Sequence, residues 1–448
     1  MKHLFGTDGI RGVAGEPPLD PATVYAVGLA LGDSLGEGAR VVVGQDTRQS
    51  SAWIAATLTA ALEQRGVAVA QAGVLPTPAV AFLAVQGDYA AGVMISASHN
   101  PFQDNGIKVF GASGYKLPDE EEAIIEAAIE RYLAAGGLPS EPGAPLPHDG
   151  DAVRLRAAYV AHLASQFPPR GLEGLRIVVD CAHGAACAAA AEVFAALGAR
   201  ATVVANQPTG TNINAGVGAL HPETLAQQVV AQGADAGLAL DGDADRAILV
   251  DARGKVVNGD AVLLMAAREL RASGHLEPPI VVGTVMTNLG LEMVLRQEGI
   301  RLERAPVGDK YVLDRMRSTG AVLGGEPSGH VIFGAEATTG DGLLTALHCF
   351  DLVARRRRPL HELCDGWVEL PQRIINVRVR EKTPLQELLP VQAAIQAAEQ
   401  YFAGSGRVLV RYSGTEKLAR VMVEAQSAAD VESFAASIAA ALQAEVGV

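Results

Sequence analysis

The chain has 448 residues, of which 49% are hydrophobic and 4% aromatic, so it is long enough for several domains with aliphatic cores. Its formal net charge of −14 argues against a nucleic acid or an anionic membrane as a partner. An anionic substrate must therefore be bound by local basic residues, because the overall field repels it.

The amino-terminal segment MKHLFGTDGIRG contains no apolar core of the length that a signal peptide needs, and we expect a cytoplasmic protein. The apolar stretch 185–198 contains Glu192 and is too short and too rich in Ala to span a bilayer. The cysteines have neither the CxxC spacing nor the histidine partners of a zinc site. We expect buried structural thiols in a reducing compartment at Cys181, Cys187, Cys349 and Cys364.

One pattern occurs three times along the chain. Each copy opens with a β-branched run, at ARVVVGQDTR (39–48), LRIVVDCAHG (175–184) and PPIVVGTVMTN (278–288). A helical stretch, a second strand and a third apolar run that ends in a polar loop follow each opening. We therefore predict an α/β protein with three related β-α-β-β domains and mixed sheets, each offering one loop to a central cleft.

Changes in composition place the domain boundaries. The Gly- and Pro-rich segment 134–151 links the first domain to the second, and the hairpin-like segment 250–260 leads into the third. The arginine run in 354–363 is interpreted as a solvated helix end. From about residue 370 the pattern predicts a small α+β domain with a predominantly antiparallel sheet. The predicted domains are 1–150, 151–255, 256–369 and 370–448.

The first chemically distinctive loop, in AGVMISASHNPFQDNG (91–106), places Ser98 at the carboxyl end of an apolar strand. A serine hydrolase does not fit, because the GxSxG elbow is absent and the adjacent Ser98 and His99 cannot readily form a triad. An Asn-Pro turn whose hydroxyl bonds the backbone stays open as an alternative.

The second loop, DGDADR, has a carboxylate at every second position after the apolar strand GLAL. In a tight loop this spacing turns Asp241, Asp243 and Asp245 toward one point and supplies hard oxygen ligands for Mg²⁺. An EF-hand does not fit, since Arg246 and Ala252 stand where that loop needs glycine and glutamate. A solvated acidic turn is the remaining alternative. Arg246 itself is placed to help neutralise a phosphoryl group.

The third loop, GGEPSGH (324–330), supplies Glu326, Ser328 and His330. A carboxylate and a hydroxyl suit vicinal sugar hydroxyls, and a histidine can share proton transfer, although this composition is also common in turns.

The fourth loop, VRYSGTEKLAR (410–420), is expected to follow a strand and open a helix, with a capping box from Ser413 to Glu416. Arg411 and Arg420 flank it and could clamp a phosphate. A plain helix cap with two surface arginines is the alternative. Arg11 on the Gly-rich amino-terminal loop and Lys108 after the serine loop could likewise be surface charges.

These four loops, in this order, resemble the motifs of the α-D-phosphohexomutase superfamily over essentially the whole chain. Within it, FGTDGIRG is similar to the opening of the bacterial phosphoglucosamine mutases. The resemblance implies four domains around a central cleft and a Ser98 that is phosphorylated in the active enzyme. It implies one Mg²⁺ per subunit, held by Ser98, Asp241, Asp243 and Asp245. The chain departs from the family pattern at Pro327, Tyr412 and Lys417.

The resemblance also implies a role for each remaining motif residue. Lys108 and Arg246 would stabilise charge on the transferring group, and Lys108 and His330 are candidates for acid/base catalysis. The expected catalytic residues are Ser98, Arg11, His99, Lys108, Arg246 and His330. Glu326 and Ser328 would bind sugar hydroxyls. The non-reacting phosphate would be bound by Arg411, Ser413, Gly414, Thr415 and Arg420.

The activity implied is the interconversion of glucosamine 6-phosphate and glucosamine 1-phosphate, primed by glucose or glucosamine 1,6-bisphosphate and supplying UDP-N-acetylglucosamine and cell-wall synthesis. The expected partner is a small-molecule sugar phosphate, with no nucleic acid and no membrane; a homodimer is left open. Three alternatives are kept: a phosphomannomutase/phosphoglucomutase, a metal-dependent phosphatase or hydrolase, and a catalytically silent sugar-phosphate-binding protein.

Overall fold

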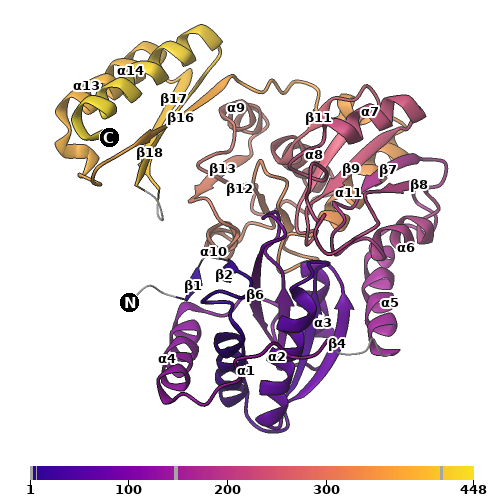
Figure 1. The fold of residues 1–448 in the computed structure, drawn as a ribbon. Coiled ribbons are helices and arrows are strands. Elements are labelled where there is room, and N and C mark those ends of the chain that lie inside the picture. Colours follow the sequence, from indigo (N-terminus) through magenta and orange to yellow (C-terminus); the bar gives the residue numbers. More distant parts are fainter. Residues whose placement is uncertain (1–3, 7, 146–149, 414–416) are drawn as a thin grey trace. The chain divides into compact units, whose positions relative to one another are not determined.

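The computed structural model describes residues 4–6, 8–145, 150–413 and 417–448 (Figure 1). Its contacts divide the chain into two compact units. Unit 1 comprises Met1–Met286 and Glu303–Asp365, and unit 2 comprises Thr287–Leu302 and Gly366–Val448.

The first repeat forms a six-stranded sheet in the order β1-β2-β6-β5-β3-β4. Strands β5, β3 and the edge strand β4 are parallel, while β6 and β2 run antiparallel to their neighbours. The strands are β1 (Phe5–Gly6), β2 (Gly9–Val13), β3 (Arg40–Gln45), β4 (Ala68–Val74), β5 (Ala91–Ile95) and β6 (Asp104–Gly111). The helices are α1 (Pro21–Leu35), α2 (Ser51–Gln64), α3 (Thr77–Gln86) and α4 (Asp119–Ala135).

Helices cover both faces of this sheet. Side chains of α1, α2 and α4 form one hydrophobic core with the strands. On the other face α3 packs so closely that a Cβ on Gly44 of β3 would lie 2.5 Å from the Val80 side chain. Because both faces are covered, every residue of β5 is buried, which explains its continuous apolar run.

The second repeat forms a five-stranded sheet in the order β11-β10-β9-β7-β8. Strands β8, β7 and β9 are parallel, and β10 returns antiparallel beside β9. The predicted hairpin at 250–260 is confirmed, because β10 pairs antiparallel with β11. The elements are α5 (Gly150–Ser165), β7 (Arg176–Asp180), α6 (Ala189–Ala196), β8 (Arg200–Val204), α7 (Glu223–Gln232), β9 (Ala236–Leu240), β10 (Ala247–Asp251) and β11 (Val256–Val257).

The third repeat forms a four-stranded sheet in the order β13-β12-β14-β15. Strand β14 is parallel to β12 and antiparallel to β15. The elements are α8 (Gly259–Ala272), β12 (Ile280–Thr284), α9 (Leu289–Gln297), β13 (Arg301–Ala305), α10 (Asp309–Thr319), β14 (Leu323–Gly325), β15 (Val331–Phe333), α11 (Gly342–Arg356) and α12 (Leu360–Leu363). The arginine run at the end of α11 is a charged helix end, where Arg355 and Arg356 pair with Glu269.

The three repeats share one strand order. Numbered within a repeat, the strands lie in the order 2-1-3-4, and the fourth is antiparallel to the third. The predicted β-α-β-β unit was incomplete, because a second helix (α3, α7 or α10) precedes each third strand. That helix is short, and in α3 it is apolar throughout, so its sequence does not separate it from a buried strand.

Unit 2 contains the predicted α+β domain. Its antiparallel sheet has the order β16-β18-β17, and its core is formed with α13 and α14. The elements are β16 (Gln372–Arg378), the 3₁₀ turn η1 (Leu385–Glu387), α13 (Leu389–Phe402), β17 (Gly406–Tyr412), β18 (Leu418–Ala425) and α14 (Ala428–Val446).

The expected helix after the fourth loop is wrong. The segment RVMVEA belongs to β18, whose residues 419–425 pair antiparallel with the whole of β17. The β-branched alternation of this segment outweighs the capping signature at Ser413.

All four cysteines are free thiols. Cys181 and Cys349 are buried, whereas Cys187 and Cys364 are only partly buried, which corrects the expectation of four buried thiols. Among the described residues, no helix has the length and apolar character that crossing a membrane requires.

Candidate active site

Three loops of unit 1 meet at one place. Each follows the third strand of its repeat: Ser98 follows β5, Asp241 follows β9 and Glu326 follows β14. The Ser98 hydroxyl donates a hydrogen bond of 2.5 Å to Asp241, which joins the first two loops. The Nδ1 atom of His330 lies 3.7 Å from Asp245, which brings the third loop to the same centre.

The backbone around Ser98 is held in an uncommon conformation, with φ at 52°. Its N–H donates to Ser96 Oγ at 3.0 Å. Its carbonyl accepts from Arg48 Nη2 and from Asn214 Nδ2, both at 2.9 Å. These bonds fix the loop from both sides and leave the hydroxyl directed at Asp241.

A buried ion pair that follows β3 supports the Ser98 loop. Arg48 Nε donates to Asp46 Oδ2 at 2.7 Å, and both side chains are fully buried. The same carboxylate accepts from Ser96 Oγ at 2.7 Å, and Arg48 also donates to the Asn100 carbonyl at 2.9 Å. The sequence prediction missed this pair, although an Asp-x-Arg directly after a buried strand was a visible signal.

The three aspartates converge as their spacing predicts. One carboxylate oxygen of each lies within 4.8 Å of the others, and all three side chains are buried. Burial, together with Asp245 and Asp243, raises the pKa of Asp241 well above its usual range. A positive charge beside the cluster would therefore stabilise the ionised carboxylates.

The free oxygens of this cluster fit a divalent cation. Among the described residues, Oδ1 of Asp243 and Oδ1 of Asp245 are buried without a hydrogen-bond partner. Buried carboxylate oxygens without partners are costly, and hard oxygen ligands are those that Mg²⁺ prefers. Asp241, Asp243 and Asp245 could thus hold a metal beside the Ser98 hydroxyl.

Gly242 lets the serine loop and the aspartate loop touch. A Cβ at this position would lie 2.5 Å from the Ser98 carbonyl oxygen, which no side chain tolerates. The glycine between the first two aspartates is therefore required for close approach rather than for flexibility.

Lys108 and Thr77 bring the first domain to Asp243. Lys108 is fully buried, and its Nζ lies 2.9 Å from Asp243 Oδ2 and 3.1 Å from Asp8 Oδ2. Burial alone would lower the pKa of Lys108, but Asp243, Asp8 and Asp245 outweigh it and raise the pKa. Thr77 Oγ1 donates to the same Asp243 oxygen at 2.6 Å. Thr77 and Asp8 were not predicted. Thr77 lies in an apolar segment that gives no polar signal, whereas Asp8 lies within the FGTDGIRG motif, from which only Arg11 was selected.

Arg11 and His99 both lie beside the Ser98 loop. Arg11 Nη1 donates to the Ala97 carbonyl at 3.2 Å and forms an ion pair with Asp8. His99 Nδ1 is 3.4 Å from Ser98 Oγ. Burial, with Arg246 and Arg11 nearby, lowers the pKa of His99 to about 4, so the ring is neutral at neutral pH.

Arg246 borders the aspartate cluster. Its backbone N–H donates to Asp241 Oδ1 at 3.2 Å, and its Nε lies 3.7 Å from Asp245 Oδ1. Burial would lower the pKa of this guanidinium, but Asp245 and Asp241 reverse the effect and keep it charged.

The third loop is tied to the start of α10. Glu326 Oε1 accepts from the Gly308 N–H at 2.9 Å, and Ser328 Oγ donates to Glu326 Oε2 at 3.2 Å. His330 is buried, and its Nε2 accepts from the Gly340 N–H at 3.2 Å. With Nε2 occupied and Nδ1 facing Asp245, this geometry favours a role in orienting Asp245 over proton transfer to a substrate.

In unit 2, Arg411 and Arg420 stand directly opposite each other on β17 and β18. Burial and the charge of Arg420 lower the pKa of Arg411. Two like charges facing each other across a hairpin are unfavourable unless an anion lies between them. Ser413 is buried at the turn, while Gly414 and Thr415 lie outside the described residues.

Two departures from the family pattern have visible partners. Tyr412 pairs with Ala419 in the ladder and donates its hydroxyl to the Thr383 carbonyl at 2.6 Å. The Lys417 carbonyl accepts from the Val379 N–H at 3.0 Å. Tyr412 thus anchors the hairpin to a neighbouring segment.

Family models for phosphoglucomutase/phosphomannomutase match the chain in four successive parts. The alpha/beta/alpha domains I, II and III match residues 2–135, 157–254 and 258–370, and the C-terminal domain matches residues 374–441.

Individual relatives match over the full length. The chain is 52% identical to a phosphoglucosamine mutase of Koribacter versatilis, over 100% of this chain and 98% of the relative. It is 51% identical to one of Solibacter usitatus, over 100% and 99%. Among solved structures, the N-acetylphosphoglucosamine mutase of Aspergillus fumigatus in complex with GlcNAc-6P and magnesium has the same fold, with a TM-score of 0.66 and 20% identity over 98% of this chain and 95% of that one.

Proposed function

The chain belongs to the phosphoglucomutase/phosphomannomutase family, and we propose that it interconverts glucosamine 6-phosphate and glucosamine 1-phosphate through a phosphorylated Ser98. The full-length identity to bacterial phosphoglucosamine mutases supports the glucosamine substrate. The observation that carries the mechanism is the 2.5 Å contact of the Ser98 hydroxyl with a buried cluster of three aspartates.

The reaction consists of two phosphoryl transfers. In the first, the free hydroxyl oxygen of glucosamine 6-phosphate attacks phosphorus on phospho-Ser98. The new P–O bond forms to the sugar, the P–O bond to Ser98 breaks, and the proton of the sugar hydroxyl is released as the Ser98 oxygen takes one up. The product is a 1,6-bisphosphate, which reorients and returns its other phosphoryl group to Ser98, leaving glucosamine 1-phosphate.

Asp241, Asp243 and Asp245 would hold Mg²⁺ together with Ser98. The two unpartnered oxygens of Asp243 and Asp245 support this assignment. When bound, the ion would supply Lewis-acid stabilisation of charge on the transferring phosphoryl group.

The cationic side chains would stabilise the same charge. Lys108 is buried and held charged at Asp243, and Arg246 borders the cluster. Preorganised charges of this kind act strongly in a water-excluded site. Arg11 is placed to hold the Ser98 loop, and His99, neutral and near the hydroxyl, is available to accept a proton.

Substrate recognition is assigned to the third and fourth loops. Glu326 and Ser328 would bind the sugar hydroxyls. Arg411 and Arg420, with Ser413, Gly414 and Thr415, would bind the phosphate that does not react. The facing charges of the two arginines support an anion site on this hairpin.

The cellular setting follows from this activity. The protein binds a small-molecule sugar phosphate, and glucose or glucosamine 1,6-bisphosphate would prime Ser98. Its product would feed UDP-N-acetylglucosamine and cell-wall synthesis in the cytoplasm. A homodimer is compatible with the proposal and is not required by it.

The proposal is tested with the wild-type protein and Ser98→Ala. We expect intact mass to show one phosphoryl group on wild-type Ser98 after incubation with glucose 1,6-bisphosphate, and turnover to fall by at least about four orders of magnitude in Ser98→Ala. Ser318→Ala serves as a control, because it removes an exposed serine hydroxyl of α10 and leaves the Ser98 loop intact.

Three outcomes would contradict it. Normal turnover by Ser98→Ala would remove the phosphoserine step. Faster turnover of mannose or glucose phosphates at matched concentration would favour a phosphomannomutase/phosphoglucomutase. Steady release of inorganic phosphate without a primer would indicate a phosphatase.

A further inference from the structure

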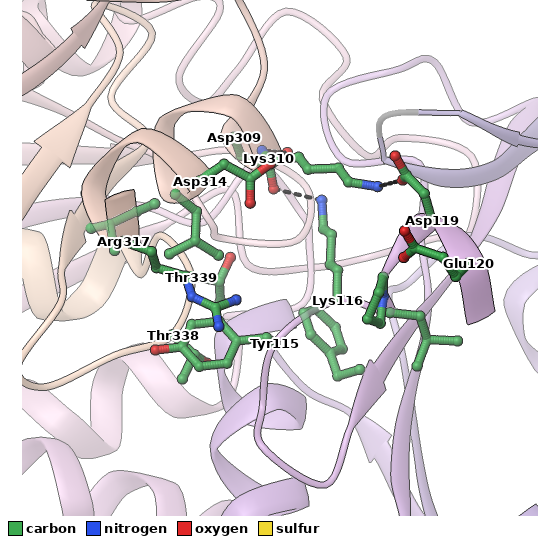
Figure 2. Close-up of a pocket in the computed structure, with 15 residues that line it drawn as sticks. Tyr115, Lys116, Asp119, Glu120, Asp309, Lys310, Asp314, Arg317, Thr338 and Thr339 are labelled. Atoms are coloured by element: carbon green, nitrogen blue, oxygen red, sulfur yellow. Dashed lines mark hydrogen bonds and ion pairs between the residues drawn. The ribbon is translucent and has the colours of Figure 1, made fainter. Parts of the chain in front are cut away.

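We propose that Lys116 is a positioning residue for the mutase reaction, because it links the catalytic lysine Lys108 to the start of α10. This inference rests on the proposed function and adds to it a residue outside the four motif loops. Lys116 lines a cavity of about 220 Å³ between the first and third repeats (Figure 2).

Lys116 joins two carboxylates from different repeats. Its Nζ lies 2.5 Å from Asp8 Oδ1 and 2.5 Å from Asp309 Oδ2. Figure 2 shows the Lys116 side chain directed at Asp309 across the cavity. The side chain is only 14% exposed, so its charge is poorly screened.

The contact continues from Asp8 into the active site. The second oxygen of Asp8 lies 3.1 Å from Lys108 Nζ, and Lys108 contacts Asp243 at 2.9 Å. Charges of alternating sign therefore run in sequence from α10 to the aspartate cluster. They are carried in turn by Asp309, Lys116, Asp8, Lys108 and Asp243.

The other end of this series reaches the third loop. Asp309 begins α10, and the residue before it, Gly308, donates its N–H to Glu326 at 2.9 Å. Lys116 itself is fixed by the hairpin after β6, where it pairs with Phe110 two residues beyond Lys108. One side chain thus relates the position of the sugar-binding glutamate to that of the lysine at the phosphoryl group.

The charge of Lys116 also changes what Asp8 does to Lys108. With Lys116 present, the charge of Asp8 is shared among Lys116, Lys108 and Arg11. Without it, Asp8 would pair more fully with Lys108 and draw the ammonium away from Asp243 and the transferring group. This contact matters when charge develops on the phosphoryl group, so its loss should lower kcat more than it raises KM.

Lys310 offers a matched control in the same cavity. It also bridges the third repeat to the first, by ion pairs with Asp119 and, at 3.6 Å, with Glu122. In the part of the chain that the structure describes, Lys310 forms no ion pair with Asp8. Lys310→Met thus removes two ion pairs between the repeats, whereas Lys116→Met removes one such pair together with the contact to Asp8. Only Lys116→Met interrupts the series.

The experiment measures kcat and KM for glucosamine 6-phosphate in the full chain, with thermal midpoints to verify folding. For Lys116→Met we expect kcat to fall about 10- to 100-fold with KM changed less than about threefold. Lys310→Met should change kcat less than about threefold. Lys116→Arg, which keeps the charge, should recover most of the lost rate. Asp309→Asn leaves Lys116 in place and should lower kcat in the same direction, which keeps the inference testable if Lys116→Met does not fold.

Wild-type turnover separates this inference from the proposed function. If the wild type has no mutase activity, the proposed function fails. If the wild type is active, then unchanged kcat in Lys116→Met and Asp309→Asn would overturn the inference alone. An equal loss in Lys310→Met would also overturn it, because domain docking would then explain the effect.

Discussion

The shortest approach between the serine loop and the aspartate loop is made at Gly242. Because the backbone of one loop fills the space where a side chain would stand on the other, the Ser98–Asp241 contact depends on the absence of a Cβ. The same residue therefore controls both local packing and the position of the reacting hydroxyl.

Gly242→Ala tests this dependence. The added methyl group must push the loops apart, and we expect a loss of about 1–3 kcal/mol of stability and about 100-fold in kcat. Gly111→Ala is the control, since a Cβ there would meet Leu117 only at an ordinary 3.8 Å. Wild-type kcat in Gly242→Ala would show that the contact is not needed for turnover.

Sequence patterns singled out residues that the structure brings together and missed several residues that hold them in place. The spacing of Asp241, Asp243 and Asp245 predicted their convergence, which the structure confirms. Asp46 and Arg48 pair with each other two residues apart and were missed although their spacing was visible. Lys116 was not predicted, because its partners Asp8 and Asp309 lie far away in the chain. A lone charged residue has the same local pattern whether it is solvated or buried in an ion pair.

At the scale of elements, each of the three loops is positioned by the third strand of its repeat, because the loop begins where that strand ends. The continuous apolar runs at β5 and β9 predicted these buried strands, and the polar residues after them predicted the loops. The helices α3, α7 and α10 were missed, and the helix expected after Ser413 is a strand. A segment as short and apolar as α3 has no decisive period, so tertiary packing determines its structure. In α7 and α10 the buried residues stand four apart, a helical spacing that the sequence analysis did not use.

The hairpin of β17 and β18 allows a prediction at this scale. If Arg411 binds the substrate phosphate as proposed, replacing it by Met should raise KM for glucosamine 6-phosphate about 10- to 100-fold. The replacement also removes a like-charge pair, so the thermal midpoint without ligand should not fall.

Arg373→Met provides the control for this prediction. Arg373 lies on β16 of the same sheet and pairs with the exposed Glu432. The KM of the Arg373→Met variant should therefore equal that of the wild type. A parallel rise of KM in both variants would assign the effect to the domain as a whole rather than to the hairpin.

At the scale of the whole molecule, Asp341 connects helices of different repeats. It caps α11 through the Leu344 N–H at 3.0 Å, and Tyr159 of α5 donates its hydroxyl to the other oxygen at 2.7 Å. Burial raises the pKa of Asp341 to about 6. The folded protein therefore binds this proton more tightly than the unfolded chain does.

This difference predicts a pH-dependent stability. Because the pKa is raised on folding, the contribution of Asp341 is complete below the unfolded value of about 4 and is lost as pH rises through about 6. Asp341→Asn keeps the cap and does not ionise. We compare the free energy of unfolding of the variant with that of the wild type by denaturant unfolding. The difference, variant minus wild type, should be roughly 1 kcal/mol larger at pH 8 than at pH 5. An identical difference at both pH values would contradict the assigned pKa.

Three copies of one strand order carry different side chains in the loop after the third strand: Ser98 in the first, three aspartates in the second, and Glu326, Ser328 and His330 in the third. Under the proposed function these would be the phosphoryl acceptor, the metal ligands and the sugar-binding groups. No copy is sufficient alone, because each lacks what the other two provide. Replacing the loop of one copy by the loop of another would keep the strand order. One set of side chains would then be present twice, and another would be missing. The three copies thus share their strand order and differ in the few loop residues that follow the third strand.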